Sequence, residues 1–147
     1  MRKPISTKVH GVLDYATAAF LHTLPRVMGW SRQATAVLDA AGASATAYSL
    51  FTDYELGAVK ALPMKAHLTL DALSGGALIA SAIVMDDEDD DVRATIAALG
   101  AFEIAAALLS RTRRDVKAGP VTGAGRVESG AWSQQSMPVA PQPATAQ

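Results

Sequence analysis

Long apolar stretches between short clusters of charge are the feature that most limits what this chain can fold into. Four such stretches, each 17 to 20 residues long and each with a single acidic residue, cover residues 9–25, 33–52, 66–85 and 94–110. An α-helix rises about 1.5 Å per residue, so about 20 residues cross the roughly 30 Å hydrocarbon layer of a membrane. Each stretch is therefore long enough, or nearly so, to span a bilayer as a helix.

The segments between the stretches contain residues that commonly end or begin helices. Pro25 and Gly29 lie in the first gap, Gly57 and Pro63 lie in the second, and Asp91 precedes the fourth stretch. None of the stretches alternates apolar and polar residues as a strand does. We therefore predict an all-α fold, with helices near residues 7–25, 33–53, 64–85 and 92–112.

The charge pattern favours a membrane bundle over a soluble one. A soluble four-helix bundle has a charged face on each helix, and these stretches have no such face. The third stretch is rich in Leu and Ile, which offset Asp71 near its end, whereas the second has few large apolar residues and would insert only as part of the bundle. The prediction is a four-helix transmembrane bundle whose main partner is the lipid bilayer.

Composition excludes several other classes of protein. The chain has no cysteine, which excludes disulfides, thiol nucleophiles and thiolate metal sites. Its net charge of −1 and its 5% share of aromatic residues argue against nucleic acid as a partner. The sequence contains no phosphate-binding loop, nucleophile–base pair or recognisable metal motif. We accordingly predict no catalytic residue, no metal and no cofactor.

Basic residues are unevenly shared between the two sides of the predicted membrane. One side has only Arg26, Arg32 and Arg93. The side of the N-terminus carries Arg2, Lys3, Lys8, Lys60, Lys65, Arg111, Arg113, Arg114 and Lys117. The positive-inside rule therefore places both termini in the cytoplasm.

The chain matches itself when it is shifted by 57 positions. Lys8-Val9-His10 then meets Lys65-Ala66-His67, and Asp14 meets Asp71. With a one-residue gap the match extends to Leu50-Phe51-Thr52 against Leu108-Leu109-Ser110. The predicted organisation is an N-terminal cytoplasmic segment, a first two-helix repeat, a cytoplasmic connector, a second repeat and a disordered tail, at 1–6, 7–53, 54–63, 64–114 and 115–147.

Two segments of the sequence resemble those of a family of small membrane proteins. The segments 8–15 (KVHGVLDY) and 48–57 (YSLFTDYELG), with the tandem Lys-x-His-x-x-x-Asp, are similar to those of the SPW-repeat integral membrane proteins. Leu24-Pro25-Arg26 and Ser81-Ala82-Ile83 stand where the family has its Ser-Pro-Trp triplet. The resemblance implies a four-span bundle of two tandem repeats in a bacterial plasma membrane, and it implies no biochemical activity.

An ionisable residue inside a membrane is costly unless another group pairs with it, so we look for a partner for each one. An even number of spans per repeat makes the first and third helices parallel, so His10 and Asp14 lie at the same depth as His67 and Asp71. We expect His10 to meet Asp71 and His67 to meet Asp14, which would hold the two repeats in register.

Two other functions remain open for the same residues. Asp14, Asp71, Glu103 and Asp39 would form a proton or cation path, with Glu103 nearest the middle of the membrane. Alternatively, the two histidines would be axial ligands in a haem or quinone redox subunit. We favour a structural or accessory protein without catalytic activity, which assembles with a second copy or with another membrane protein.

Overall fold

The computed structural model describes residues 3–113, and within this range it contains four α-helices and no strand of more than an isolated bridge. The helices are α1 (Thr7–Met28), α2 (Arg32–Leu50), α3 (Met64–Val84) and α4 (Asp90–Leu109). The predicted all-α fold with four helices is confirmed. The predicted tail, residues 115–147, lies outside the described residues.

Helix α1 extends three residues beyond the end that the sequence predicts. It passes through Pro25 and ends at Met28, and the next residue, Gly29, adopts the left-handed conformation with φ of 68°. The backbone N–H of Trp30 donates to the Pro25 carbonyl at 2.9 Å and closes the last turn. Glycine, which has no Cβ to clash in this conformation, therefore ends the helix, whereas Pro25 lies inside it.

Helix α2 ends three residues before the predicted boundary, at Leu50. The Thr52 hydroxyl donates to the Tyr48 carbonyl at 2.7 Å, and the N–H groups of Ala61 and Leu62 donate to the Phe51 carbonyl. These bonds satisfy carbonyls at the end of the helix and fold residues 51–63 back against it.

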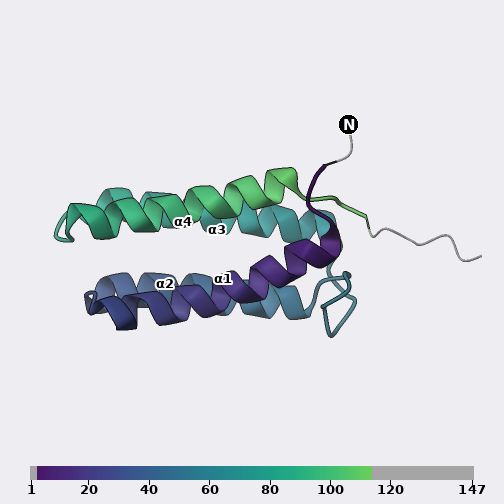
Figure 1. Ribbon diagram of the computed structural model, residues 1–147, viewed down its shortest axis with the longest axis horizontal. Helices are drawn as coiled ribbons and strands as arrows, with labels where there is room; N and C mark the ends of the chain where they lie inside the picture. Colours follow the sequence, from purple (N-terminus) through teal and green to yellow (C-terminus); the bar gives the residue numbers. More distant parts are fainter. Residues whose placement is uncertain (1–2, 114–147) are drawn as a thin grey trace, which may run out of the picture. The chain divides into compact units, whose positions relative to one another are not determined.

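The helices run as two antiparallel pairs (Figure 1), in which α1 packs mainly on α2 and α3 mainly on α4. Helices α1 and α3 begin at the same end of the bundle and run in the same direction. We call this end, which holds Ile5, the 51–63 connector and Ser110, the near end, and the end with loops 29–31 and 85–89 the far end. At the near end Ile5 N–H donates to the Leu109 carbonyl at 3.2 Å, and Arg111 N–H donates to the Ile5 carbonyl at 2.9 Å.

Glycines allow the two helices of each pair to approach closely. A Cβ at Gly100 would lie 2.3 Å from the Gly75 carbonyl oxygen, and a Cβ at Gly42 would lie 3.1 Å from the Ala18 carbonyl oxygen. By contrast, a Cβ at Gly76 would meet nothing within 4 Å. The close contact between α3 and α4 therefore depends on Gly75 and Gly100 and not on Gly76.

The interior differs between the two ends of the bundle. Towards the far end it is apolar, with Leu21, Leu38, Leu78, Met85 and Ile96 packed together. Towards the near end the buried side chains are mainly polar or ionisable: Thr7, His10, Ser49, Thr52, His67, Asp71, Glu103 and Ser110. The buried polar residues are thus gathered in one half of the bundle.

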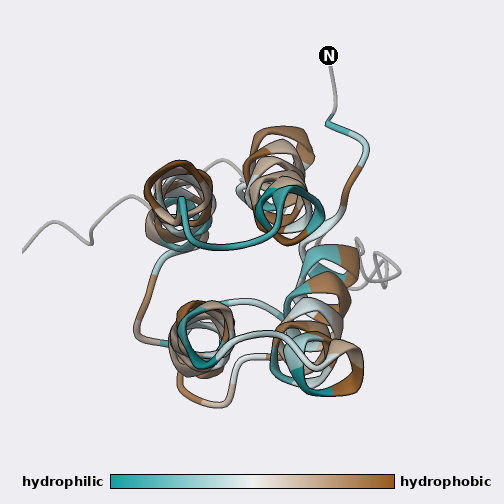
Figure 2. Cartoon of the chain, turned by 90° about the vertical axis from the view of Figure 1, so that its left-hand side faces the viewer, coloured by the Kyte–Doolittle hydropathy of each residue, from teal (hydrophilic) through white to brown (hydrophobic). Residues whose placement is uncertain are grey.

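The outer surface carries many large apolar side chains. Figure 2, which looks along the bundle from the far end, shows hydrophobic residues on the outward faces of the helices. They include Val12, Phe20, Leu73, Ile83, Phe102 and Leu108, which are between 45% and 67% exposed. By length and composition, α3 and α4 qualify as candidate membrane spans, and α1 and α2 do not. The second helix in particular is made mostly of Ala, Ser and Thr.

Candidate functional site

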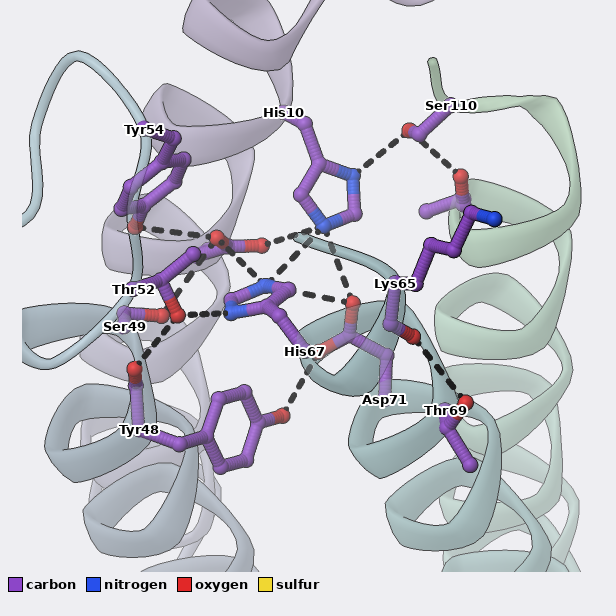
Figure 3. A network of polar contacts seen from close by, with 12 residues as sticks. His10, Tyr48, Ser49, Thr52, Tyr54, Lys65, His67, Thr69, Asp71 and Ser110 are labelled. Carbon is purple, nitrogen blue, oxygen red and sulfur yellow. Dashed lines mark hydrogen bonds and ion pairs between the residues drawn. The ribbon is translucent and has the colours of Figure 1, made fainter. Parts of the chain in front are cut away.

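Two histidines and two aspartates meet between α1 and α3 in the near half of the bundle (Figure 3). We refer to His10, Asp14, His67 and Asp71 as the His–Asp centre. His10 Nε2 lies 2.9 Å from Asp71 Oδ2, and His67 Nε2 lies 3.1 Å from Asp14 Oδ2. Each histidine therefore contacts the acid of the other helix, as the sequence predicts from equal depth.

Contacts within each helix and between the rings complete the centre. The Nε2 atoms of His10 and His67 lie 3.2 Å apart, and each also lies within 3.3 Å of the acid four residues later in its own helix. One ligand atom from each of the four residues lies within 4.8 Å of all the others. All four side chains thus converge on a single point.

A hydroxyl group lies within hydrogen-bond distance of the Nδ1 atom of each ring. Ser110 Oγ lies 2.7 Å from His10 Nδ1, and Thr52 Oγ1 lies 2.7 Å from His67 Nδ1. Ser110 also donates to the Ala106 carbonyl, and Thr52 to the Tyr48 carbonyl, each at 2.7 Å. The ends of α4 and α2 therefore orient the rings that α1 and α3 supply.

The carboxylates have hydroxyl partners of their own. Tyr48 donates to Asp71 Oδ1 at 2.7 Å, while Tyr54 and Ser49 donate to Asp14 Oδ2 at 3.2 and 3.4 Å. Tyr54 lies in the connector, where burial raises the pKa of its phenol, so the group stays protonated and remains a donor at neutral pH.

The sequence alone indicates no role for these hydroxyl residues. The internal match does align Thr52 with Ser110, and that alignment was the one available signal. It could not indicate that both side chains reach back to a ring nitrogen, because this depends on how each helix ends.

The centre is shielded from solvent. The side chains of His10 and His67 are 1% and 0% exposed, and those of Asp14 and Asp71 are 9% and 8% exposed. Within residues 3–113 the carboxylates contact imidazoles and hydroxyls and form no ion pair with Lys or Arg. Two buried carboxylates need compensating positive charge, which protons on the rings or a bound cation would supply.

Glu103 lies beside the centre, across a small cavity. The cavity is also lined by His10, Asp14, Tyr48 and Asp71, and its volume of about 20 Å³ has room for roughly one water molecule. Neither carboxylate oxygen of Glu103 accepts a well-formed hydrogen bond among the described residues, although the side chain is buried and Ser74 lies close to it. This acid is therefore available for a proton or for water.

Asp39 lies apart from Glu103, with which the predicted ion path groups it. It lies towards the far end, where His22 Nδ1 and Arg26 Nη1 each approach its Oδ1 at 2.8 Å. Asp39 precedes Ala45, the first α2 residue that lines the cavity, by six residues, or about 9 Å of helix. We call His22, Arg26 and Asp39 the surface cluster, since their side chains are 41%, 56% and 32% exposed.

The haem alternative does not fit this geometry. Axial ligands of a haem lie on opposite faces of the porphyrin ring. Here the two Nε2 atoms are 3.2 Å apart, and the adjoining cavity measures about 20 Å³. A porphyrin has no space between these rings.

Comparisons of the chain with protein-family models, curated proteins and solved structures gave no match. The resemblance to the SPW-repeat proteins therefore stays a prediction from the sequence.

Proposed function

We propose that this chain is a small integral membrane protein of structural or accessory type, in which the His–Asp centre ties two tandem two-helix repeats together. The observation that carries the proposal is the distribution of side chains. Large apolar residues cover the outside of the helices, whereas histidines and acids are buried between them. This arrangement suits a bundle in lipid, where apolar groups face the solvent and polar groups must find partners inside.

The two most apolar helices support a membrane location. In their most apolar windows only 33% of α3 and 28% of α4 is buried inside the bundle. The core helix of a soluble protein would bury most of such a segment. The other residues of each window are half-buried or exposed, and those that face outward would contact lipid.

Equivalent contacts in the two halves support the tandem repeat. A shift of 57 or 58 residues relates His10 to His67, Thr52 to Ser110 and Gly42 to Gly100. Each histidine of the centre is held by the hydroxyl that ends the opposite repeat, and each of these glycines lies against the first helix of its own repeat. These correspondences make a two-repeat membrane bundle of the SPW-repeat type our preferred assignment.

The charges of the near end favour a cytoplasmic position for it. Lys3, Lys8, Lys60, Lys65 and Arg111 lie there, whereas the far-end loop after α3 is the acidic run 86–91. We propose lipid as the main partner, with a second copy or another membrane protein as the assembly partner.

Cell fractionation tests the membrane proposal directly. We expect the protein to remain in the pellet after alkaline carbonate washing and to require detergent for extraction. Recovery as a monodisperse helical protein in the detergent-free supernatant would overturn the proposal.

Because the chain lacks cysteine, single substitutions can report sidedness. Val59→Cys in the connector and Asp87→Cys in the far-end loop are both at exposed positions. In intact cells a membrane-impermeant maleimide should label Asp87→Cys only, and both variants after lysis. The opposite pattern would reverse the proposed orientation, and equal labelling in intact cells would argue against a membrane-spanning bundle.

Proton or cation conduction is the second candidate function. It is favoured by Glu103, whose buried carboxyl accepts no well-formed hydrogen bond among the described residues and faces the cavity beside the centre. In proteoliposomes Glu103→Gln should abolish a pH-dependent flux, whereas Asp39→Asn, outside the cavity, should leave it unchanged. Absence of flux in the wild-type protein, or flux unaffected by Glu103→Gln, would exclude this candidate.

A further inference from the structure

We propose that the His–Asp centre binds one divalent transition-metal ion of the zinc class, with both Nε2 atoms and one oxygen of each carboxylate as ligands. The inference goes beyond the membrane proposal and does not depend on it. It rests on the hydrogen-bond roles of the hydroxyls, on the spacing of the ligand atoms and on the charge of the centre.

The hydroxyls determine which ring nitrogen carries the proton. A carbonyl oxygen only accepts hydrogen bonds, so Ser110 and Thr52 use their single protons on the carbonyls of Ala106 and Tyr48. Each hydroxyl must then accept from the imidazole 2.7 Å away. Both rings therefore carry hydrogen on Nδ1, and in a neutral ring this leaves the Nε2 lone pair bare.

Bare Nε2 atoms in this position face other lone pairs. His10 Nε2 has His67 Nε2 at 3.2 Å and carboxylate oxygens at 2.9 and 3.2 Å. A single proton on a ring can satisfy only one of these neighbours. Full protonation of both rings would neutralise the acids, but it would place two positively charged rings with their Nε2 atoms 3.2 Å apart. One cation at the common point satisfies all four groups together.

Three of the four ligand atoms have the spacing of a tetrahedral site, and the fourth ligand, Asp14, lies beside them. With bonds of about 2.0–2.1 Å to nitrogen and oxygen, neighbouring ligands of a tetrahedral zinc ion lie about 3.3 Å apart. His10 Nε2, His67 Nε2 and Asp71 Oδ2 lie 2.9–3.3 Å from one another. Asp14 approaches His10 through Oδ1 at 3.2 Å and His67 through Oδ2 at 3.1 Å, and one oxygen of each acid lies within 4.8 Å of the other ligand atoms. The side chains thus surround a space of the size that such an ion needs.

The ligand types select the class of ion. Two imidazoles and two carboxylates suit Zn²⁺ and its first-row neighbours, whereas Ca²⁺ and Mg²⁺ take six or more oxygen ligands. A divalent ion also balances the two carboxylates, which have no Lys or Arg partner within residues 3–113. Four protein ligands make a closed site, which is typical of structural zinc. The ion would therefore fasten α1 to α3.

The outer shell follows the pattern of known metal sites, in which a ligating histidine donates its other N–H and ligating carboxylates accept hydrogen bonds. Here the rings of His10 and His67 donate to Ser110 and Thr52. Tyr48 donates to Asp71, and Tyr54 donates to Asp14. Every ligand has a partner that fixes its orientation.

Metal analysis of the full-length protein tests the proposal. The protein, with an affinity tag free of histidine, is purified in detergent and analysed by mass spectrometry of its metals. We expect about one Zn²⁺ per chain and, after stripping with a chelator, uptake of one Co²⁺ with the intense visible absorption of tetrahedral cobalt. Folded wild-type protein that binds neither ion, or a weak octahedral cobalt spectrum, would overturn the proposal.

Variants assign the ion to the centre. His67→Gln and Asp71→Asn should lose the ion, while His22→Gln and Asp39→Asn, the matched changes in the surface cluster, should keep it. Loss of the ion in the surface-cluster variants alone would place it there and overturn the assignment.

Outer-shell variants keep the test decisive if the ligand variants do not fold. Thr52→Val and Ser110→Ala should weaken zinc affinity by about 10- to 100-fold, whereas Thr52→Ser keeps the hydroxyl and should bind like the wild type. Equal affinity in all three would contradict the proposed geometry. Because binding is measured on the folded chain, a negative result leaves the membrane proposal untouched.

Discussion

Each half of the bundle contains a histidine from α1 that meets an aspartate from another helix at nearly the same distance. His10 lies 2.9 Å from Asp71 in the near half, and His22 lies 2.8 Å from Asp39 in the far half. The first pair is 1% and 8% exposed, whereas the second is 41% and 32% exposed. Contact distance alone therefore does not distinguish the two, and their burial and number of partners do.

The two pairs differ in burial because different side chains fill the interior of the two halves. In the far half Leu21, Leu38 and Ile96 are fully buried, which leaves His22 and Asp39 nearer the surface. There Arg26, in the last turn of α1, adds a second partner for Asp39, and at the proposed far-end membrane surface water screens the charges. In the near half the buried ionisable groups lie beside a small apolar cluster and contact one another, so each depends on the others for compensation. Substitutions in the two halves should accordingly differ greatly in cost.

The largest effect is expected from Asp71→Ala in the His–Asp centre. The change removes the buried carboxylate that both imidazoles contact and that accepts from the Tyr48 hydroxyl. Breaking a buried pair costs about 3–5 kcal/mol, and loss of a bound ion would add to this. Reversible unfolding in detergent, followed by circular dichroism, measures the change in free energy. A loss below about 1 kcal/mol, the range of surface pairs, would mean that burial does not set the difference between the halves.

The next effect tests the apolar half. Leu38 is fully buried, and Leu38→Ala should cost about 2–5 kcal/mol through lost burial and the cavity left behind. Leu73, which is 64% exposed, is the matched control, and Leu73→Ala should change the free energy of unfolding by about 0.5 kcal/mol or less. The same unfolding measurement applies. Equal costs at the two leucines would contradict the assignment of an apolar core to the far half.

A smaller effect is expected at the crossing of α3 and α4. Gly100→Ala places a Cβ 2.3 Å from the Gly75 carbonyl oxygen, so the helices must separate at a cost of about 1–3 kcal/mol. Gly76→Ala meets no atom within 4 Å and should instead stabilise the helix by up to about 1 kcal/mol. Thermal melting of the two variants should therefore shift in opposite directions. Shifts of the same sign would contradict the close glycine contact.

The sequence predicts the features that depend on the length and spacing of its apolar stretches. It does not predict the contacts that depend on how each helix ends. Four helices followed from the length of the apolar stretches, and the meeting of His10 with Asp71 followed from the 57-residue match. Ser110 could not be predicted as a partner of His10, because it lies just beyond α4 and is brought there by the turn of the chain. The sequence could not show that Asp39 lies apart from Glu103, because it does not determine how deep in the bundle each acid lies.

The smallest effect is expected from Asp39→Asn in the surface cluster. The substitution removes the charge that Arg26 and His22 contact, but these side chains are 56% and 41% exposed near the end of α1 and regain water at the proposed far-end membrane surface. Exposed ion pairs contribute about 0–1 kcal/mol and are screened by salt, so the cost should fall further as ionic strength rises. Unfolding at low and high salt measures it, with Arg26→Gln as the companion variant. A cost near that of Asp71→Ala, or one that salt leaves unchanged, would show that Asp39 is shielded from water and that the surface cluster, like the centre, stabilises the bundle from within.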